Sequence, residues 1–367
     1  MFSDALITAI NDSRSKIIVF AVVRNEMLRL RAFLKHYRAM GIRLFVIVDN
    51  GSEDGTFEYL QKQGDVLVVR TLESFAASNF GLHWLNELHR KLAGNRWILF
   101  ADADELLVYR DWPIKTVAEL CAEAAAQGGN AIFAPMLDMY PNGPLESAEM
   151  TEEGDLFAVS PCFDRDICFR LRPVKPWEKP FKSIEIIGGP RVRMISNFKK
   201  EVNTGWPSYF IRGQIDRLLP ITPDILLPWL VRIWPKQPPA LAKMPLAMSG
   251  VGSTYSTNHG GDGWRFHTEN AVVCHFKFLS DFPERVRAEA SRGEHYRRGA
   301  EYIAYAHALQ KHGQIDLRYE GTEIFEGVEQ LQRLGFFRDI HALLMGGIKR
   351  STSSENRETR RLQKGVV

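Results

Sequence analysis

The chain has few of the features that mark secreted or membrane proteins. Its 367 residues include only four cysteines, and none of them forms a C-x-x-C pair, which is typical of free thiols in a reducing compartment. No run of about 18 apolar residues occurs, so we expect no membrane-spanning helix. Residues 1–16 contain Asp4 and lack a long apolar core, which argues against a secretory signal. The sequence therefore predicts a cytoplasmic protein.

A strong excess of charge of one sign is also missing. The net charge is +3, and the segment from Lys349 onward contributes six basic and two acidic residues, or +4. The rest of the chain therefore carries −1, which argues against a nucleic-acid partner. Residues 347–367 are polar and have no apolar period, so we expect a disordered tail that is solvated rather than bound to anionic lipid.

Prolines concentrate in one segment. Residues 216–240 hold six of the 18 prolines, among large apolar residues, and this density breaks long helices. Two interpretations stay open for the segment. It is either a lid or surface in peripheral contact with a membrane interface, or an irregular packed insertion.

Over the first 140 residues, apolar runs alternate with helical patterns. Runs rich in β-branched residues, typical of buried parallel strands, lie at residues 16–23, 43–49, 65–69, 96–102 and 130–137. Helical spacing or capping signals separate them, including a capping box at Thr116 and Glu119. This alternation predicts an α/β fold with a doubly wound, mostly parallel sheet.

Polar residues follow three of these predicted strands, at the point where each strand ends. In parallel α/β sheets, ligands bind beyond the carboxyl ends of the strands. Converging acids at that edge are costly to desolvate unless a divalent cation or ligand donor groups neutralise them. Each group alone is an ordinary turn or helix start, so the prediction of a ligand site depends on their shared position. The residues are Arg24, Asn25 and Glu26, then Asp49, Asn50 and Ser52, then Asp102, Asp104 and Glu105.

The order in which these motifs occur together is specific for one group of proteins. The pattern "VVRNE…FLKHYRAMGIRLFVIVDNGSEDGT…WILFADADEL" resembles the nucleotide-binding half of glycosyltransferase family 2 and its relatives with the GT-A fold, over residues 16–137. The resemblance implies that Glu26 and Asp49 contact the nucleoside, usually uridine. It also implies that Asp102 lies near the ribose or the metal and that Asp104 ligates the metal. Arg24 and Asn50 are further candidates for nucleotide binding.

Two later segments resemble the late part of the same branch and of family 92-type transferases. They are "KMPLAM…YSTNH" at residues 243–259 and "AVVCHFKFLSDF" at residues 271–282. In GT-A enzymes a late histidine often completes the metal shell. His259 lies in a loop rich in Gly, Ser and Thr, so we favour it as a metal ligand, with His275 as a second candidate that supports the site or contacts phosphate. Lys243 or Lys277 is expected to meet the diphosphate.

An inverting transferase needs a carboxylate that takes the proton of the acceptor hydroxyl. Family 2 members place an acidic pair after the D-x-D motif, and this sequence has no clear pair there. Asp138 and Asp164 are the preferred candidates for the catalytic base, with Glu185 as a third choice. The departure leaves the stereochemical outcome open.

By this resemblance we expect four regions. Residues 1–140 form the nucleotide-sugar-binding half of a GT-A domain, and residues 141–280 form an acceptor half that completes the metal site. Residues 281–346 form a helical C-terminal extension, and residues 347–367 form the disordered basic tail.

The predicted function is transfer of a hexose from a nucleotide diphosphate sugar, with UDP as the expected nucleotide, to a hydroxyl of a glycan or glycolipid acceptor. Mn²⁺ or Mg²⁺ is the expected cofactor, and the resemblance points to synthesis of cell-surface polysaccharide or glycoconjugate. A nucleotidyltransferase is the alternative enzyme, but the loop after the first strand has no glycine to hold a triphosphate. A non-catalytic sugar-binding protein is the other alternative, and the retained Asp102 and Asp104 argue against it.

Overall fold

The computed structural model describes most of the chain. It covers residues 1–13, 15–150, 154–171, 184–195, 226, 241–250, 252, 254–257 and 260–349. The predictions on His259, on the Pro-rich segment apart from Leu226, and on residues 350–367 fall outside this range. Within the described residues, no helix combines the length and apolar character that a membrane span requires.

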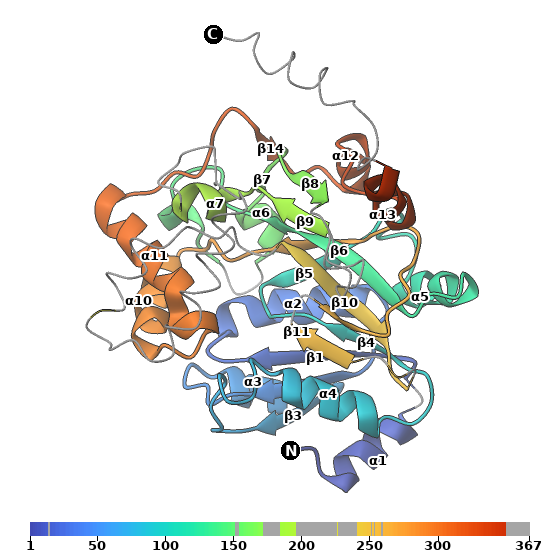
Figure 1. The fold of residues 1–367 in the computed structure, drawn as a ribbon. Coiled ribbons are helices and arrows are strands. Elements are labelled where there is room, and N and C mark those ends of the chain that lie inside the picture. Colours follow the sequence, from blue (N-terminus) through green and yellow to red (C-terminus); the bar gives the residue numbers. More distant parts are fainter. Residues whose placement is uncertain are drawn as a thin grey trace.

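An eight-stranded sheet forms the centre of the molecule (Figure 1). Its strands lie in the order β3-β2-β1-β4-β10-β6-β13-β5. All run in one direction except β10 and β5, which are antiparallel to their neighbours. The predicted α/β class with a mostly parallel sheet is therefore confirmed. The strands are β1 (Ile17–Val23), β2 (Phe45–Asp49), β3 (Val66–Arg70), β4 (Trp97–Phe100), β5 (Glu105–Val108), β6 (Ala131–Asp138), β10 (Ala242–Met248) and β13 (Val272–His275).

Helices cover both faces of this sheet, because alternate residues of each strand point to opposite sides. In β1, Val19 and Ala21 belong to a hydrophobic cluster shared with α2 and α5, whereas Ile18 and Phe20 belong to a cluster shared with α1 and α4. The predicted capping box at Thr116 is present at the start of α5. The helices of this half are α1 (Asp4–Asp12), α2 (Met27–Ala39), α3 (Thr56–Gln61), α4 (Leu82–Lys91) and α5 (Val117–Ala126).

The second part of the chain completes the same sheet. β10 lies between β4 and β6, and β13 lies between β6 and β5, so the regions on either side of residue 140 share one sheet. Three two-stranded pairs, β11–β12, β14–β7 and β8–β9, lie outside it. The remaining elements before residue 281 are η1 (Leu145–Ser147), α6 (Leu156–Val159), β7 (Cys162–Asp164), β8 (Cys168–Leu171), β9 (Ile184–Ile187), α7 (Pro190–Ile195), β11 (Thr254–Thr257) and β12 (Gly260–Asp262).

The part of the chain after residue 281 is mainly helical within the described residues. Tyr302 and Tyr305 are buried on α11, and β14 adds a strand that pairs with β7. The last helix includes residues 347–349, which the sequence had placed in the disordered tail. The elements are α10 (Phe282–Arg292), α11 (Tyr296–His312), β14 (Thr322–Ile324), α12 (Val328–Arg333) and α13 (Ile340–Lys349). In Figure 1, α10 and α11 lie beside the carboxyl end of β1.

Candidate active site

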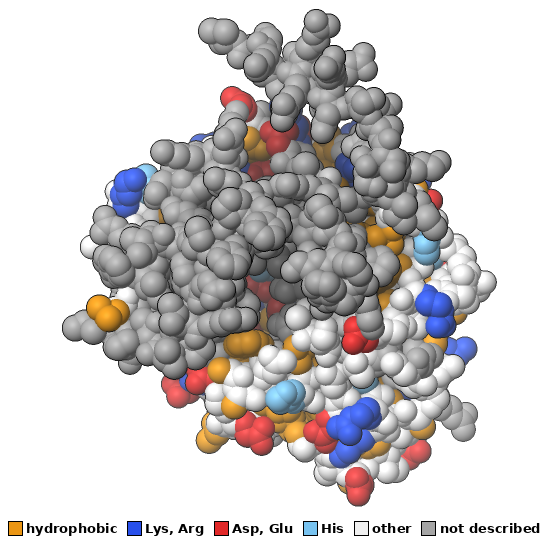
Figure 2. All heavy atoms as spheres, in the orientation of Figure 1, with side chains coloured by type: hydrophobic (Ala, Val, Ile, Leu, Met, Phe, Trp, Pro, Cys, Tyr) orange, Lys and Arg blue, Asp and Glu red, His pale blue; other side chains and the backbone are white. Residues whose placement is uncertain are grey.

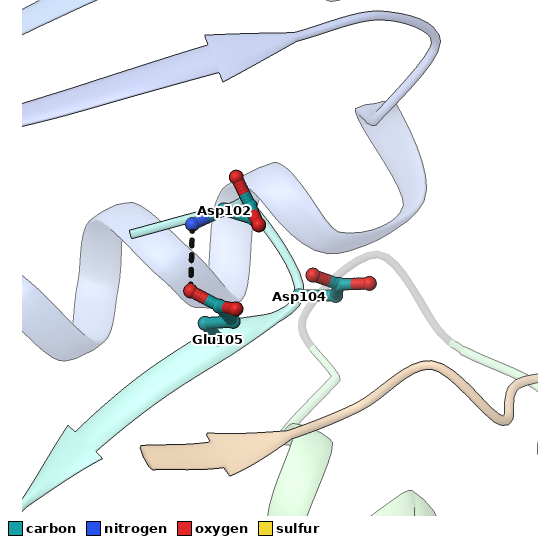
Figure 3. Close-up of side chains that lie close together, drawn as sticks. All are labelled: Asp102, Asp104 and Glu105. Atoms are coloured by element: carbon teal, nitrogen blue, oxygen red, sulfur yellow. Dashed lines mark hydrogen bonds between the residues drawn. The ribbon is translucent and has the colours of Figure 1, made fainter. Parts of the chain in front are cut away.

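The acidic motif forms the tight turn between β4 and β5. Asp102, Asp104 and Glu105 each offer an oxygen within 4.8 Å of the others. Ala101 and Ala103 are buried, and the Glu105 amide donates to the Asp102 carbonyl at 3.0 Å. Figure 3 shows Glu105 accepting a hydrogen bond from the Asp102 amide, 3.0 Å away, while Asp104 projects from the far end of the turn.

Lys243 neutralises one side of this turn. Its ammonium contacts Glu105 and lies 3.3 Å from Asp102 Oδ2, and the side chain is almost fully buried on β10. Burial alone lowers the pKa of Lys243, but Asp102 and Glu105 raise it above its ordinary value, so the ammonium stays charged. Lys243 is therefore the counterion of Glu105 here, whereas the sequence predicted that Lys243 or Lys277 meets the diphosphate.

His275 occupies the other side of the turn. Strand register explains its position, because His275 pairs with Glu105 of β5 and with Asp138 of β6. Its Nε2 lies 3.5 Å from Asp104 Oδ2, and its Nδ1 lies 2.6 Å from Asp138 Oδ1. The sequence favoured His259, which lies outside the described residues, yet it is His275 that stands beside Asp104.

The charges around this histidine are strongly coupled. Burial lowers the pKa of His275, but Asp104 and Asp138 raise it overall. Burial raises the pKa of Asp104, yet His275, Arg285 and Arg29 bring it well below its ordinary value. Asp104 is therefore ionised, and His275, Arg285 and Arg29 supply the positive charge that stabilises it.

Asp138 has a different environment from the one expected of a catalytic base. It is buried at the end of β6, and its second oxygen accepts from Arg191 Nε at 2.7 Å. Burial raises the pKa of Asp138, but Arg191 and His275 lower it overall. With both oxygens occupied, this carboxylate is arranged to orient His275 rather than to accept a proton from an acceptor.

Asp164 lies in a separate cluster. It is buried on β7, where it accepts from the Tyr140 hydroxyl at 2.8 Å and from Arg193. None of its partners among the described residues belongs to the acidic turn, so this second candidate base makes no direct contact there with the predicted metal ligands. The side chain of Glu185, the third choice, lies outside the description.

Asp49 has an unusual hydrogen-bonding state at the end of β2. It is fully buried, and its Oδ2 accepts from the Ser52 amide at 3.2 Å and lies 3.5 Å from Arg70 Nε. Its Oδ1 has no hydrogen-bond partner among the described residues. A buried oxygen without a donor is costly, so Asp49 is suited to receive an N–H or O–H group from a ligand after a local side-chain movement.

The other predicted nucleotide ligands contact α10 or its neighbours. Glu26 is held by Arg285, with Arg285 Nη1 3.1 Å from Oε2, and Arg29 lies 3.6 Å away. Asn50 Oδ1 lies 3.3 Å from Arg292 Nη2, and the Arg24 guanidinium donates to the Asn50 carbonyl at 3.1 Å. These strand ends therefore face arginines of the C-terminal extension.

Several charged residues of the site were missed by sequence reasoning. Arg29 stands three positions after Glu26 in a helical segment, a spacing that signals an ion pair. Arg191, Arg285 and Glu301 come from distant segments without a local motif, and only the fold brings them here.

Carboxylates outnumber basic side chains around the acidic turn. Seven carboxylates and five Arg or Lys side chains form three ion-paired groups there, and His275, whose pKa is raised, adds a positive charge when protonated. Burial raises the pKa of Glu105 to about 7 and that of Glu26 to about 6, which reduces the negative charge they carry near neutral pH. A divalent cation at the acidic turn would add to the counterions of the remaining carboxylates. The acids are Glu26, Asp102, Asp104, Glu105, Asp138, Asp281 and Glu301, and the bases are Arg29, Arg191, Lys243, Lys277 and Arg285.

Comparison with family models and with curated proteins found no match for this chain. The fold and the site therefore define a class only: an α/β protein with an acidic, histidine-containing site at the carboxyl edge of a mostly parallel sheet.

Proposed function

We propose that this protein is a metal-dependent glycosyltransferase with a GT-A type fold, which transfers a sugar from a nucleotide diphosphate sugar to an acceptor hydroxyl. The observation that carries the proposal is the pairing of Asp104 with His275 at the carboxyl edge of the sheet, 3.5 Å apart. The motif resemblance and the order of the first four strands support it. We extend the proposal to UDP as the donor nucleotide and to a polysaccharide or glycoconjugate as the acceptor. We also propose that the protein acts in the cytoplasm.

The residues present fit a divalent cation. Asp138 holds one ring nitrogen of His275, and the other nitrogen faces Asp104. Carboxylates that hydrogen-bond the far nitrogen of a metal-binding histidine orient its ring in this way. Asp102 is half exposed and can supply a further oxygen. One imidazole among oxygen ligands suits Mn²⁺. Asp104, His275 and Asp102 would hold the ion, which when bound supplies Lewis-acid stabilisation of the leaving diphosphate.

The protein's own residues account for binding and orientation. The unpartnered Asp49 oxygen would accept a hydrogen bond from the nucleoside, which fits its buried position at the end of β2. Lys243 keeps Glu105 neutralised, so Asp104 rather than Glu105 faces the ligand. Asp138 fixes the orientation of His275. The base that deprotonates the acceptor stays unassigned.

A thermal-shift experiment tests the proposal. The protein is heated with UDP, GDP, CMP or dTDP, each with and without Mn²⁺. We expect UDP with Mn²⁺ to raise the melting temperature most, since a ligand at 100 times its Kd adds about 2.7 kcal/mol to stability. If no nucleoside diphosphate shifts the melting temperature, the proposal is wrong.

Asp104→Asn separates metal binding from folding. The variant should remain folded, yet lose Mn²⁺-dependent UDP stabilisation and turnover, with metal affinity falling on the order of 100-fold. Because His275 stabilises the charged Asp104, a small fall in the melting temperature of the ligand-free protein is also expected. Asp111→Asn is the matched control, since Asp111 is exposed and pairs only with Lys115 among the described contacts. A variant that keeps full turnover would contradict the assignment.

A further inference from the structure

We propose that Arg285 of α10 binds the diphosphate of the donor and that Glu26 positions Arg285 for this contact. The proposal rests on the proposed function and assigns the diphosphate to a residue that the sequence motifs do not include. It also changes the role of Glu26, which the family resemblance assigns to the nucleoside.

α10 presents two arginines to the sheet edge. Arg285 and Arg292 are seven residues apart, or about two helical turns, so they project from the same face of the helix. Arg285 meets Glu26 just beyond β1, and Arg292 meets Asn50 just beyond β2. The face of α10 that carries them therefore runs along the ends of two neighbouring parallel strands.

Strand order places Arg285 between the two halves of the predicted ligand. β1 lies between β2, which ends at Asp49, and β4, which leads to Asp102 and Asp104. In a nucleotide diphosphate sugar, the diphosphate joins the nucleoside to the sugar. With the nucleoside at the end of β2 and the metal at the end of β4, the diphosphate must pass over the end of β1, where Arg285 lies.

Arg285 has donors to spare for this role. A guanidinium carries five N–H groups in a planar fork that matches phosphate oxygens, and Glu26 accepts from two of them. The Arg285 side chain is 23% exposed, whereas that of Glu26 is 8% exposed, so part of the arginine remains accessible to a ligand.

Glu26 is itself held in place by contacts with Arg29 and Thr56. Arg29 is fully buried, is 3.6 Å from Glu26, and is anchored by two hydrogen bonds of 2.6 and 2.7 Å to Asp281. The Glu26 amide also donates to Thr56 Oγ1 at 3.0 Å. A carboxylate held in this way is suited to orient a flexible arginine, and it has little freedom to turn toward a nucleoside.

Calorimetry with three ligands tests the proposal. Uridine, UDP and inorganic pyrophosphate are titrated, in the presence of Mn²⁺, into the wild type and into Arg285→Ala, Arg285→Lys and Glu26→Gln. We expect Arg285→Ala to weaken UDP and pyrophosphate by about 10- to 100-fold, the loss of one charge-assisted hydrogen-bonding group, and to leave uridine unchanged. Arg285→Lys keeps the positive charge but lacks the planar fork, so its affinity for UDP and pyrophosphate should lie between those of the wild type and Arg285→Ala. Arg287→Ala, on the exposed side of α10, is the control and should match the wild type.

Glu26→Gln decides the role of the carboxylate. If Glu26 positions Arg285, the variant loses affinity for UDP and pyrophosphate but binds uridine normally, and the loss is not additive with Arg285→Ala. If uridine weakens as much as UDP, Glu26 contacts the nucleoside and the positioning role is wrong. Unchanged UDP affinity in folded Arg285→Ala and Arg285→Lys overturns the diphosphate assignment while leaving the glycosyltransferase proposal intact. A wild type that binds no nucleoside diphosphate overturns both.

Discussion

At the scale of single residues, Asp138 is the position where two roles make different predictions. As the carboxylate that orients His275, it acts on the metal, and as a base it acts on the acceptor. We expect Asp138→Asn to lower Mn²⁺ affinity about 10- to 100-fold, the usual effect of losing a carboxylate behind a histidine ligand. Metal titrations of UDP stabilisation measure this.

The turnover of the same variant completes the test. At saturating Mn²⁺ the orienting role predicts that most of the rate returns. A rate that stays low with unchanged Mn²⁺ affinity would restore Asp138 as the catalytic base. Arg191→Lys serves as a comparison, because it keeps a positive charge beside Asp138 and leaves the carboxylate in place.

His89 makes a prediction about stability and pH. It is buried on α4 against Tyr255 and Trp264, and neither ring nitrogen has a hydrogen-bond partner among the described residues. Burial lowers the pKa of His89 to about 4, from 6.5 in the unfolded chain. Below pH 6.5 the His89 side chain binds a proton in the unfolded state but not in the folded state. The stability of the folded protein is therefore highest above pH 6.5 and falls as the pH approaches 4.

His89→Leu should therefore stabilise the protein. We expect a gain on the order of 1 kcal/mol at pH 7 from removing unpaired buried nitrogens. The acid-induced loss should shrink by up to about 3 kcal/mol below pH 4. It should not vanish, because burial also lowers the pKa of His36 to about 4. Urea unfolding between pH 4 and 8 measures both effects, with the exposed His83→Gln on the same helix as control. A less stable His89→Leu would mean that the imidazole is held by a partner.

At the scale of elements, the start of α5 has the capping box that the sequence predicted. Thr116 Oγ1 accepts from the Glu119 amide at 3.3 Å, and Glu119 Oε2 accepts from the Thr116 amide at 2.7 Å. We expect Thr116→Ala to cost about 1 kcal/mol, because it removes one of these bonds at an exposed helix end. Glu119→Ala should cost less, and the double variant should cost less than the sum, since the two side chains act together. Fully additive losses in urea unfolding would contradict a reciprocal box.

Local patterns predicted most of the strands of the first 140 residues, although not β5, because each signal lies within its own segment. The strands at β1, β2, β3, β4 and β6 follow from apolar runs, and D-x-D follows from acids at a strand end. Pairing between distant strands carries no such signal. β10 enters antiparallel between β4 and β6, and β13 brings His275 beside Asp138, through contacts that span more than 100 residues. Sequence reasoning therefore weighed the two histidines by loop composition and favoured His259.

The same limit explains the charged network. Asp102 and Asp104 stand in one motif, but their counterions come from β10, β13 and α10. An arginine such as Arg285 on a helix surface gives no sign in the sequence that it meets Glu26, which lies 259 positions earlier. The candidate site could thus be located from the sequence, whereas the residues that neutralise and orient it required the fold.

At the scale of the whole molecule, the surface and the site differ in charge pattern. Figure 2 shows acidic and basic side chains interspersed over the described part of one face, without a continuous patch of one sign. Carboxylates are instead gathered at the sheet edge, in the acidic turn and beside His275. This grouping of carboxylates favours the binding of a cation at the sheet edge.

The C-terminal extension is linked to that edge at several points. Asp281 binds Arg29, Arg285 binds Glu26, and Arg292 contacts Asn50. Glu294 accepts from the Ser74 hydroxyl at 2.6 Å and from the Ala76 amide at 2.9 Å. The loops after β1, β2 and β3 are thus each joined to one short stretch of the extension.

The contacts between the extension and the sheet edge lead to a prediction about hydrogen exchange. A ligand bound at the sheet edge should slow hydrogen exchange in residues 281–295 together with the loops after β1, β2 and β3, because these segments open together or stay closed together. We expect UDP with Mn²⁺ to protect all of them, and Mn²⁺ alone to protect mainly residues 102–105 and the end of β13. Exchange at α5, which lies on a face of the sheet away from these contacts, is the internal control. Protection confined to the acidic turn in the presence of UDP would show that the extension opens independently of the ligand, since a coupled unit cannot be stabilised at one end alone.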